Sequence, residues 1–190
     1  MCGSGEWSPP VLVTSPLTLK LEEGGEVFLP CFVSRLGSCV PTWQHGDRVL
    51  SVGHMMVRRD DRLRVTGYHG LVISRVVGSD RGLYSCRVDY QGYVQQVQHR
   101  VEVMERPRVV GQPSTGLLAV TEGETVVVRC AASGWPNPVI RWYRAHTLLD
   151  TGLSLSLNLT RHTEGQYLCV ADNGIGQPAN KSFTISVLCE

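Results

Sequence analysis

The chain has 190 residues, of which 42% are hydrophobic and 18% are charged, and its formal net charge at pH 7 is +1. This length is enough for two domains of about 95 residues each. Basic and acidic residues nearly balance in each half, so the composition argues against nucleic acid as a partner. No apolar run approaches the roughly 20 residues that cross a bilayer, so we expect membrane attachment only through an anchor absent from this chain.

The first predicted strand lies in the segment EEGGEVFLPCF, where an acidic, glycine-bearing turn precedes alternating apolar residues. Val27, Leu29 and Cys31 occupy every second position, a pattern typical of a half-buried strand. Trp43 stands twelve positions after Cys31. The segments RVLSV and HMMVR follow it.

The segment SDRGLYSC contains the next regular spacing, with Asp80, Gly82, Tyr84 and Cys86 two residues apart. Residues two apart in a strand point to the same face. Tyr84 and Cys86 are therefore predicted to share one face of a strand, and Gly82 is expected to let the backbone turn into it.

The second half of the chain repeats this order. TEGETVVVRCA places Cys130 in another alternating strand, Trp142 follows twelve positions later, and TEGQYLC ends with Tyr167 two residues before Cys169. Turn signals recur about every 8–12 residues and no long helical period appears, which favours an all-β sandwich fold. A pattern that occurs twice indicates a repeated structural unit.

The series Cys, Trp, Tyr-x-Cys resembles the hallmark set of immunoglobulin domains. The resemblance implies two tandem immunoglobulin-like β-sandwiches, residues 1–104 and residues 105–190, with the boundary in VEVMERPRVV. The first would be of V/I type with extra C′ and C″ edge strands, and the second a compact I/C2-type domain. No Gly/Ser-rich linker separates them, so we expect limited hinge motion.

The hallmark positions imply specific structural roles. The implied disulfides, each joining two sheets, are Cys31–Cys86 and Cys130–Cys169, and the implied core residues are Trp43, Tyr84, Trp142 and Tyr167. We also predict a salt bridge between Arg62 and Asp80. Thr163 stands at the position equivalent to Asp80, so no such pair is expected in the second domain.

Several motifs narrow the resemblance to one family. LPCFVSRLG, MVRRDDRLRV and YLCVADNGIGQPA are similar to the first two domains of lachesin-type and Klingon-type neural adhesion proteins, relatives of the IgLONs. The resemblance covers about residues 16–188. It implies an extracellular cell-surface protein that recognises itself or a related immunoglobulin adhesion protein, with no enzymatic activity, no cofactor and no metal.

In that family the partner binds the exposed side of the C, C′, C″, F and G strands of the first domain. Alternation predicts which side chains point outward there, and Arg100 is expected outside as well. The predicted contact residues are Thr42, Gln44, Leu50, Val52, His54, Met55, Met56, Ser85, Arg87, Asp89, Gln96 and Gln98. An alternative is that Leu50, Val52 and one methionine only fill the edge of the sandwich.

Other sequence features concern glycosylation, catalysis and metal binding. Asn158 and Asn180 begin N-x-S/T sequons, which are predicted glycosylation sites in a secreted protein. The six histidines are scattered, with no nucleophile–base–acid arrangement, and no C-x-x-C pair supports a zinc site. Alternative functions that remain open are a soluble secreted immune or decoy binder and the ligand-binding fragment of a receptor.

Three cysteines remain after the hallmark pairs. We predict that Cys2 can reach Cys39 at the tip of the first domain, with an unpaired Cys39 thiol as the alternative. Cys189 ends the last predicted strand of the second domain, and it is expected to be free or to link two molecules.

Overall fold

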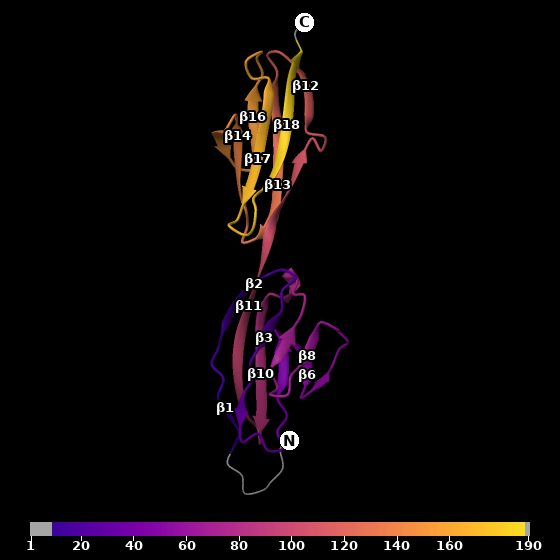
Figure 1. Ribbon diagram of the computed structural model, residues 1–190, viewed down its shortest axis with the longest axis vertical. Helices are drawn as coiled ribbons and strands as arrows, with labels where there is room; N and C mark the ends of the chain where they lie inside the picture. The colour runs from indigo at the N-terminus through magenta and orange to yellow at the C-terminus, as the bar shows by residue number, and fades with distance from the viewer. Residues whose placement is uncertain (1–8, 189–190) are drawn as a thin grey trace. The chain divides into compact units, whose positions relative to one another are not determined.

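The computed structural model describes residues 9–188. The chain divides into two compact units, one ending at Met104 (unit 1) and one beginning at Glu105 (unit 2), and each has its own buried core. Strands dominate both units (Figure 1), and the described residues contain a single short helix, the 3-10 turn η1 (Gly78–Asp80). Across residues 9–188 no helix is long and apolar enough to cross a bilayer. The predicted all-β fold is confirmed.

Unit 1 is built from two main sheets. The first runs in the order β2, β11, β10, β5, β6, β7 and comprises β2 (Thr18–Glu22), β11 (Tyr93–Gln112), β10 (Gly82–Tyr90), β5 (Thr42–His45), β6 (Arg48–Val52) and β7 (Met55–Met56). The second contains β3 (Val27–Leu29), β9 (Leu71–Ile73) and β8 (Leu63–Val65), and a short pair joins β1 (Val11–Leu12) to β4 (Val33–Ser34). In immunoglobulin terms β5, β6, β7, β10 and β11 are the C, C′, C″, F and G strands.

Unit 2 also has two sheets. One runs in the order β12 (Leu117–Thr121), β18 (Ala179–Leu188), β17 (Gly165–Asp172), β14 (Val139–Arg144) and β15 (Thr147–Thr151). The other contains β16 (Ser154–Asn158), β13 (Thr125–Trp135) and the residues of β11 from Glu105 onward. β15 is an edge strand of the five-stranded sheet, and all of its residues are exposed.

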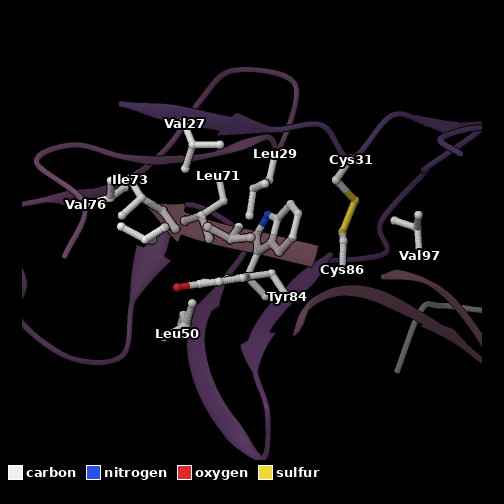
Figure 2. Close-up of a cluster of buried hydrophobic side chains, with 13 residues drawn as sticks. Val27, Leu29, Cys31, Leu50, Leu71, Ile73, Val76, Tyr84, Cys86 and Val97 are labelled. Carbon is white, nitrogen blue, oxygen red and sulfur yellow. A yellow bond between two sulfur atoms is a disulfide. The ribbon is translucent and has the colours of Figure 1, made fainter. Parts of the chain in front are cut away.

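The core of unit 1 follows from the alternation seen in the sequence. Every second residue of β3 points inward, and Val27, Leu29 and Cys31 are buried together with Trp43. The predicted Cys31–Cys86 disulfide is present, and Figure 2 shows it beside the buried side chains of the cluster. Burial of this apolar surface, together with the covalent link, is the main source of stability in a domain this small.

Unit 2 repeats the arrangement. Cys130 on β13 and Cys169 on β17 form the second disulfide, and Trp142 and Phe183 are fully buried next to it. The indole N–H of each core tryptophan donates a hydrogen bond to a backbone oxygen in a loop. Trp142 Nε1 donates to the backbone oxygen of Gly152 at 3.0 Å. Trp43 Nε1 donates to the backbone oxygen of His69 at 2.7 Å.

A buried tyrosine hydroxyl closes the turn before the F strand in both units. The hydroxyl of Tyr84 donates to the backbone oxygen of Asp80 at 2.9 Å, and that of Tyr167 donates to the backbone oxygen of Thr163 at 2.7 Å. Burial raises the pKa of the Tyr84 hydroxyl, so the group stays protonated and able to donate. Gly82 enters the strand at φ 141°, a conformation that a side chain would disfavour.

The side chain of Asn173 connects strand β11 to two loops of unit 2. Its carboxamide Nδ2 donates to the backbone oxygens of Glu105 and Pro136, both at 2.8 Å, and its Oδ1 accepts from the N–H of Ile175 at 3.1 Å. One side chain therefore holds the first residue of unit 2, the loop before β14 and the loop after β17 in a fixed arrangement.

Candidate protein-binding face

The outward side of the β11–β10–β5–β6–β7 sheet in unit 1, called the candidate face below, carries most of the predicted contact residues. Strand pairing aligns five of them across the sheet: Gln96, Arg87, Thr42, Val52 and Met55 are directly opposite one another from β11 to β7. Residues directly opposite in neighbouring strands present their side chains on the same face. This row therefore forms one continuous surface.

A second, more polar row lies beside the first. Gln98, Ser85, Gln44 and Val49 are opposite one another on β11, β10, β5 and β6. Gln98 Nε2 donates to Ser85 Oγ at 3.2 Å. Arg87 links the two rows, because its Nη1 donates to Gln44 Oε1 at 3.3 Å. Cross-strand hydrogen bonds hold these side chains flat on the sheet.

Exposed apolar side chains lie at the β6–β7 edge of the face and also on β10 and β11. Met55 is 69% exposed and Val52 is 40% exposed. Leu83 and Val94, which sequence reasoning missed, are exposed on β10 and β11. Leu83 lies two residues before Ser85 on β10, so the alternation used for Ser85 and Arg87 could have found it. Exposed apolar residues within a polar surround are typical of a protein contact surface.

The prediction that Leu50 lies on the exposed face is wrong. Leu50 is 8% exposed and belongs to the core of unit 1. The cause is a register shift in the β5–β6 pair, where Trp43 is opposite Ser51 but Gln44 is opposite Val49. This bulge adds one residue to β6, so both Leu50 and Ser51 turn inward.

Two other predicted contact residues are less accessible than expected. Ser85 points to the outer side, where its hydroxyl accepts from Gln98, but it is only 7% exposed. Met56 is half-buried and packs against the core, as the edge-filling alternative proposed. Val52, His54 and Met55 are exposed.

The remaining predicted positions are placed as follows. Asp89 is exposed, and its Oδ1 accepts from the N–H of Gly92 at 3.1 Å. Arg100 is exposed opposite Leu83. In unit 2, Asn158 and Asn180 are both exposed, and Asn158 Oδ1 accepts from Thr125 Oγ1 at 2.9 Å.

The predicted ion pair of Arg62 and Asp80 is present in unit 1. Arg62 Nη1 donates to Asp80 Oδ2 at 2.6 Å and its Nη2 to Asp80 Oδ1 at 3.2 Å, while Asp60 takes two further bonds from the same guanidinium. These hydrogen bonds raise the pKa of Arg62, with Asp80 the larger cause, and lower that of Asp60.

Apart from the four cysteines of the two hallmark disulfides, the structure describes only Cys39. Cys39 is buried and disulfide-bonded, so the alternative of an unpaired Cys39 thiol is wrong. Cys2 and Cys189 lie outside the described residues, so the predictions made for them stay predictions. Within residues 9–188 no three His, Cys, Asp or Glu side chains come together in a way that could hold a metal ion.

Comparison with known proteins relates both units to one fold family. The model of the immunoglobulin I-set domain matches residues 10–104, and that of the immunoglobulin domain matches residues 106–187. Lachesin of Schistocerca americana is 30% identical over 185 residues, which cover 86% of this chain and 53% of the relative. The chain therefore spans about half the length of that relative.

Other relatives share these domains in different contexts. The peroxidasin homolog of Mus musculus is 32% identical over 183 residues, but the match covers 90% of this chain and only 12% of that protein. Among solved structures, a chain in the crystal structure of Dpr11 IG1 bound to DIP-gamma IG+IG2 matches with a TM-score of 0.85 and 28% identity, covering 95% of this chain and 99% of that one. Taken with the two disulfide-linked sandwiches, these matches show that the chain belongs to the immunoglobulin family, with an I-set domain as its first half.

Proposed function

We propose that this chain is a recognition module of a cell-surface adhesion protein and that it pairs with another immunoglobulin protein through the candidate face. The observation that carries the proposal is the continuous outward row from Gln96 to Met55, with its exposed apolar end and hydrogen-bonded polar part. A similar solved chain comes from a complex of two immunoglobulin proteins, Dpr11 and DIP-gamma, which supports a partner of the same kind.

The partner is expected to be a second copy of this protein or a related immunoglobulin adhesion protein. The similarity to Lachesin supports the cell-surface location that the resemblance to lachesin-type adhesion proteins implies. Two disulfides form and persist in an oxidising, extracellular compartment, which agrees with this location. In this proposal the protein has no enzymatic activity and no cofactor, and Asn158 and Asn180 carry glycans.

The experiment is sedimentation of the secreted fragment over a range of concentrations, comparing the parent chain with Met55→Arg. Because Met55 is exposed, the substitution is expected to leave folding intact, whereas burying an unpaired arginine in a contact costs about 2–5 kcal/mol. We therefore expect self-association to weaken at least tenfold. Where the parent is monomeric, the same pair is compared for binding to related immunoglobulin ectodomains on a biosensor.

The matched control is Val127→Arg, an exposed apolar residue of β13 in unit 2, which we expect to have no effect on association. A Met55→Arg chain that associates as tightly as the parent would remove this face from the proposal.

A further inference from the structure

Two histidines that are 15 positions apart in the sequence come together at the edge of unit 1. The ring centroids of His54 and His69 are 4.9 Å apart, with the ring planes inclined at 37°. His54 lies in the turn between β6 and β7, and His69 lies in the turn between β8 and β9. The other four histidines form no such pair among the described residues.

The separation suits a shared metal ion. When two imidazoles bind one ion at metal–nitrogen distances of about 2.0–2.1 Å, their centroids are roughly 4.5–5.2 Å apart for N–metal–N angles between about 90° and 109°. The observed 4.9 Å falls inside this range. The chemistry also fits, since neutral imidazole is a preferred ligand of zinc, copper and nickel.

One ring nitrogen of the pair has no hydrogen-bond partner among the described residues. Nδ1 of His69 is covered and makes no hydrogen bond to any described group, which is unusual for a polar atom in a folded protein.

One turn is bonded to the core strand β5 and the other to the residue just before it, so the pair is held in place before any ion arrives. The indole of Trp43 donates to the backbone oxygen of His69, and the N–H of His69 donates to that of Thr66 at 2.9 Å. On the other side, the N–H of Gly53 donates to the backbone oxygen of Pro41 at 2.8 Å. Preorganisation reduces the entropy that ion binding must overcome.

We propose that His54 and His69 form a two-histidine site for a divalent transition-metal ion, Cu²⁺ or Zn²⁺. The described residues supply these two nitrogen ligands, and water occupies the other coordination positions. The ion clamps the β6–β7 turn to the β8–β9 turn. The site does not depend on the proposed function, since neither the pairing partner nor the rest of the candidate face takes part in it.

The test is calorimetric titration of the untagged 190-residue chain with Zn²⁺ and then with Cu²⁺, without chelating buffer. We expect one ion per chain, tighter binding of Cu²⁺ than of Zn²⁺, and no binding of Mg²⁺ or Ca²⁺ at the same concentrations. His54→Ala and His69→Asn are each expected to lower the affinity at least tenfold. The double variant lacks both imidazoles and is expected to bind more weakly than either single variant.

The control is His146→Asn. Like His69, His146 occupies a turn at positive φ, 68° against 60°, and asparagine tolerates that conformation. This variant is expected to bind as the parent does. Single variants at His54 and His69 that titrate like the parent would overturn the site, as would an equal loss in His146→Asn.

A second measurement needs no variant. In the folded parent chain, Zn²⁺ is expected to shift the imidazole proton resonances of His54 and His69 in nuclear magnetic resonance spectra, while those of the exposed His146 and His162 stay in place. Equal shifts in all four would also overturn the site. Thermal unfolding provides a third readout, because an ion that binds only the native state raises its stability.

Discussion

His99 on β11 is fully buried in unit 1 and makes hydrogen bonds with both ring nitrogens. Nδ1 accepts from the N–H of Leu17 at 3.2 Å, and Nε2 lies 2.9 Å from the backbone oxygen of Pro30, to which it donates. This pattern requires the neutral ring protonated at Nε2. Burial lowers the pKa of His99 and outweighs the opposing hydrogen bond to Pro30.

The lowered pKa predicts acid destabilisation of unit 1. Between the ordinary histidine pKa near 6.5 and the lower native value, the unfolded chain binds a proton that the folded chain does not. The contribution of neutral His99 to the free energy of unfolding is therefore complete above about pH 6.5. It declines as the pH falls below that value, by at most about 1.4 kcal/mol per pH unit.

We expect His99→Gln to be less stable at pH 7.5 but to lose less stability than the parent between pH 6.5 and 5. Urea unfolding at several pH values measures both slopes. The exposed His162→Gln variant is the control and is expected to keep the parent slope. Equal slopes in His99→Gln and the parent would contradict this account.

The ion pair of Arg62 gives a second prediction at the scale of single residues. Asp80 is almost buried, and it binds both Arg62 and the N–H of Val77, whereas Asp60 is more exposed. Asp80→Ala is expected to lower the free energy of unfolding by about 2–3 kcal/mol, because the N–H of Val77 and two N–H groups of the Arg62 guanidinium lose their acceptor. Asp60→Ala is expected to cost at most about 1 kcal/mol. Chemical denaturation distinguishes the two, and equal losses would contradict the difference in burial.

At the scale of elements, β6 shows where alternation stops being a reliable guide. A strict period of two places Leu50 and Val52 on the same face, yet the bulge opposite β5 turns Leu50 into the core and leaves Val52 outside. Val, Leu and Ser are compatible with either face of a strand, so the sequence RVLSV contains no signal for the extra residue. Without such a bulge, the same reasoning placed Arg87, Gln96 and Gln98 outside, where the structure has them.

In unit 2, the backbone of Gly111 on β11 lies very close to the side chain of Phe183 on β18. A Cβ at Gly111 would come within 2.6 Å of the Phe183 ring, which is fully buried and packs against Trp142. Gly111→Ala is expected to destabilise unit 2 by about 1–3 kcal/mol, because the ring has no free space to move into. Calorimetry measures the shift in the melting temperature. The neighbouring Val110→Ala, at an exposed position, is expected to stay within about 0.5 kcal/mol of the parent.

At the scale of the whole molecule, each unit has a core and a disulfide of its own. Replacing both Cys130 and Cys169 with alanine is expected to cost unit 2 about 2–5 kcal/mol and to unfold it near body temperature. Unit 1 is expected to keep its fold, because its core includes none of the changed residues. Hydrogen exchange resolved by residue tests this, and loss of protection in both units would show that they do not fold separately.

The sequence could predict the two sandwiches and both disulfides, because Cys31 and Cys86 and their counterparts recur with a tryptophan at the same offset. It could not predict the pairing of His54 with His69. That contact depends on how the β6–β7 and β8–β9 turns fold toward each other, and neither turn has a sequence signature for the other.

The hydrogen bonds of Asn173 affect how the protein ages chemically. Asn173 precedes Gly174, and an asparagine before glycine loses ammonia readily when the next backbone nitrogen attacks the carboxamide. In unit 2 three hydrogen bonds hold that carboxamide, and the N–H of Gly174 is occupied by Asp172 Oδ1 at 2.9 Å. An aspartate at this position would direct a carboxylate at two carbonyl oxygens that now receive N–H groups. Folding of unit 2 therefore slows the deamidation of Asn173. Each unfolding event exposes Asn173 to this reaction, and Asn173 is the residue that holds Glu105 at the start of unit 2.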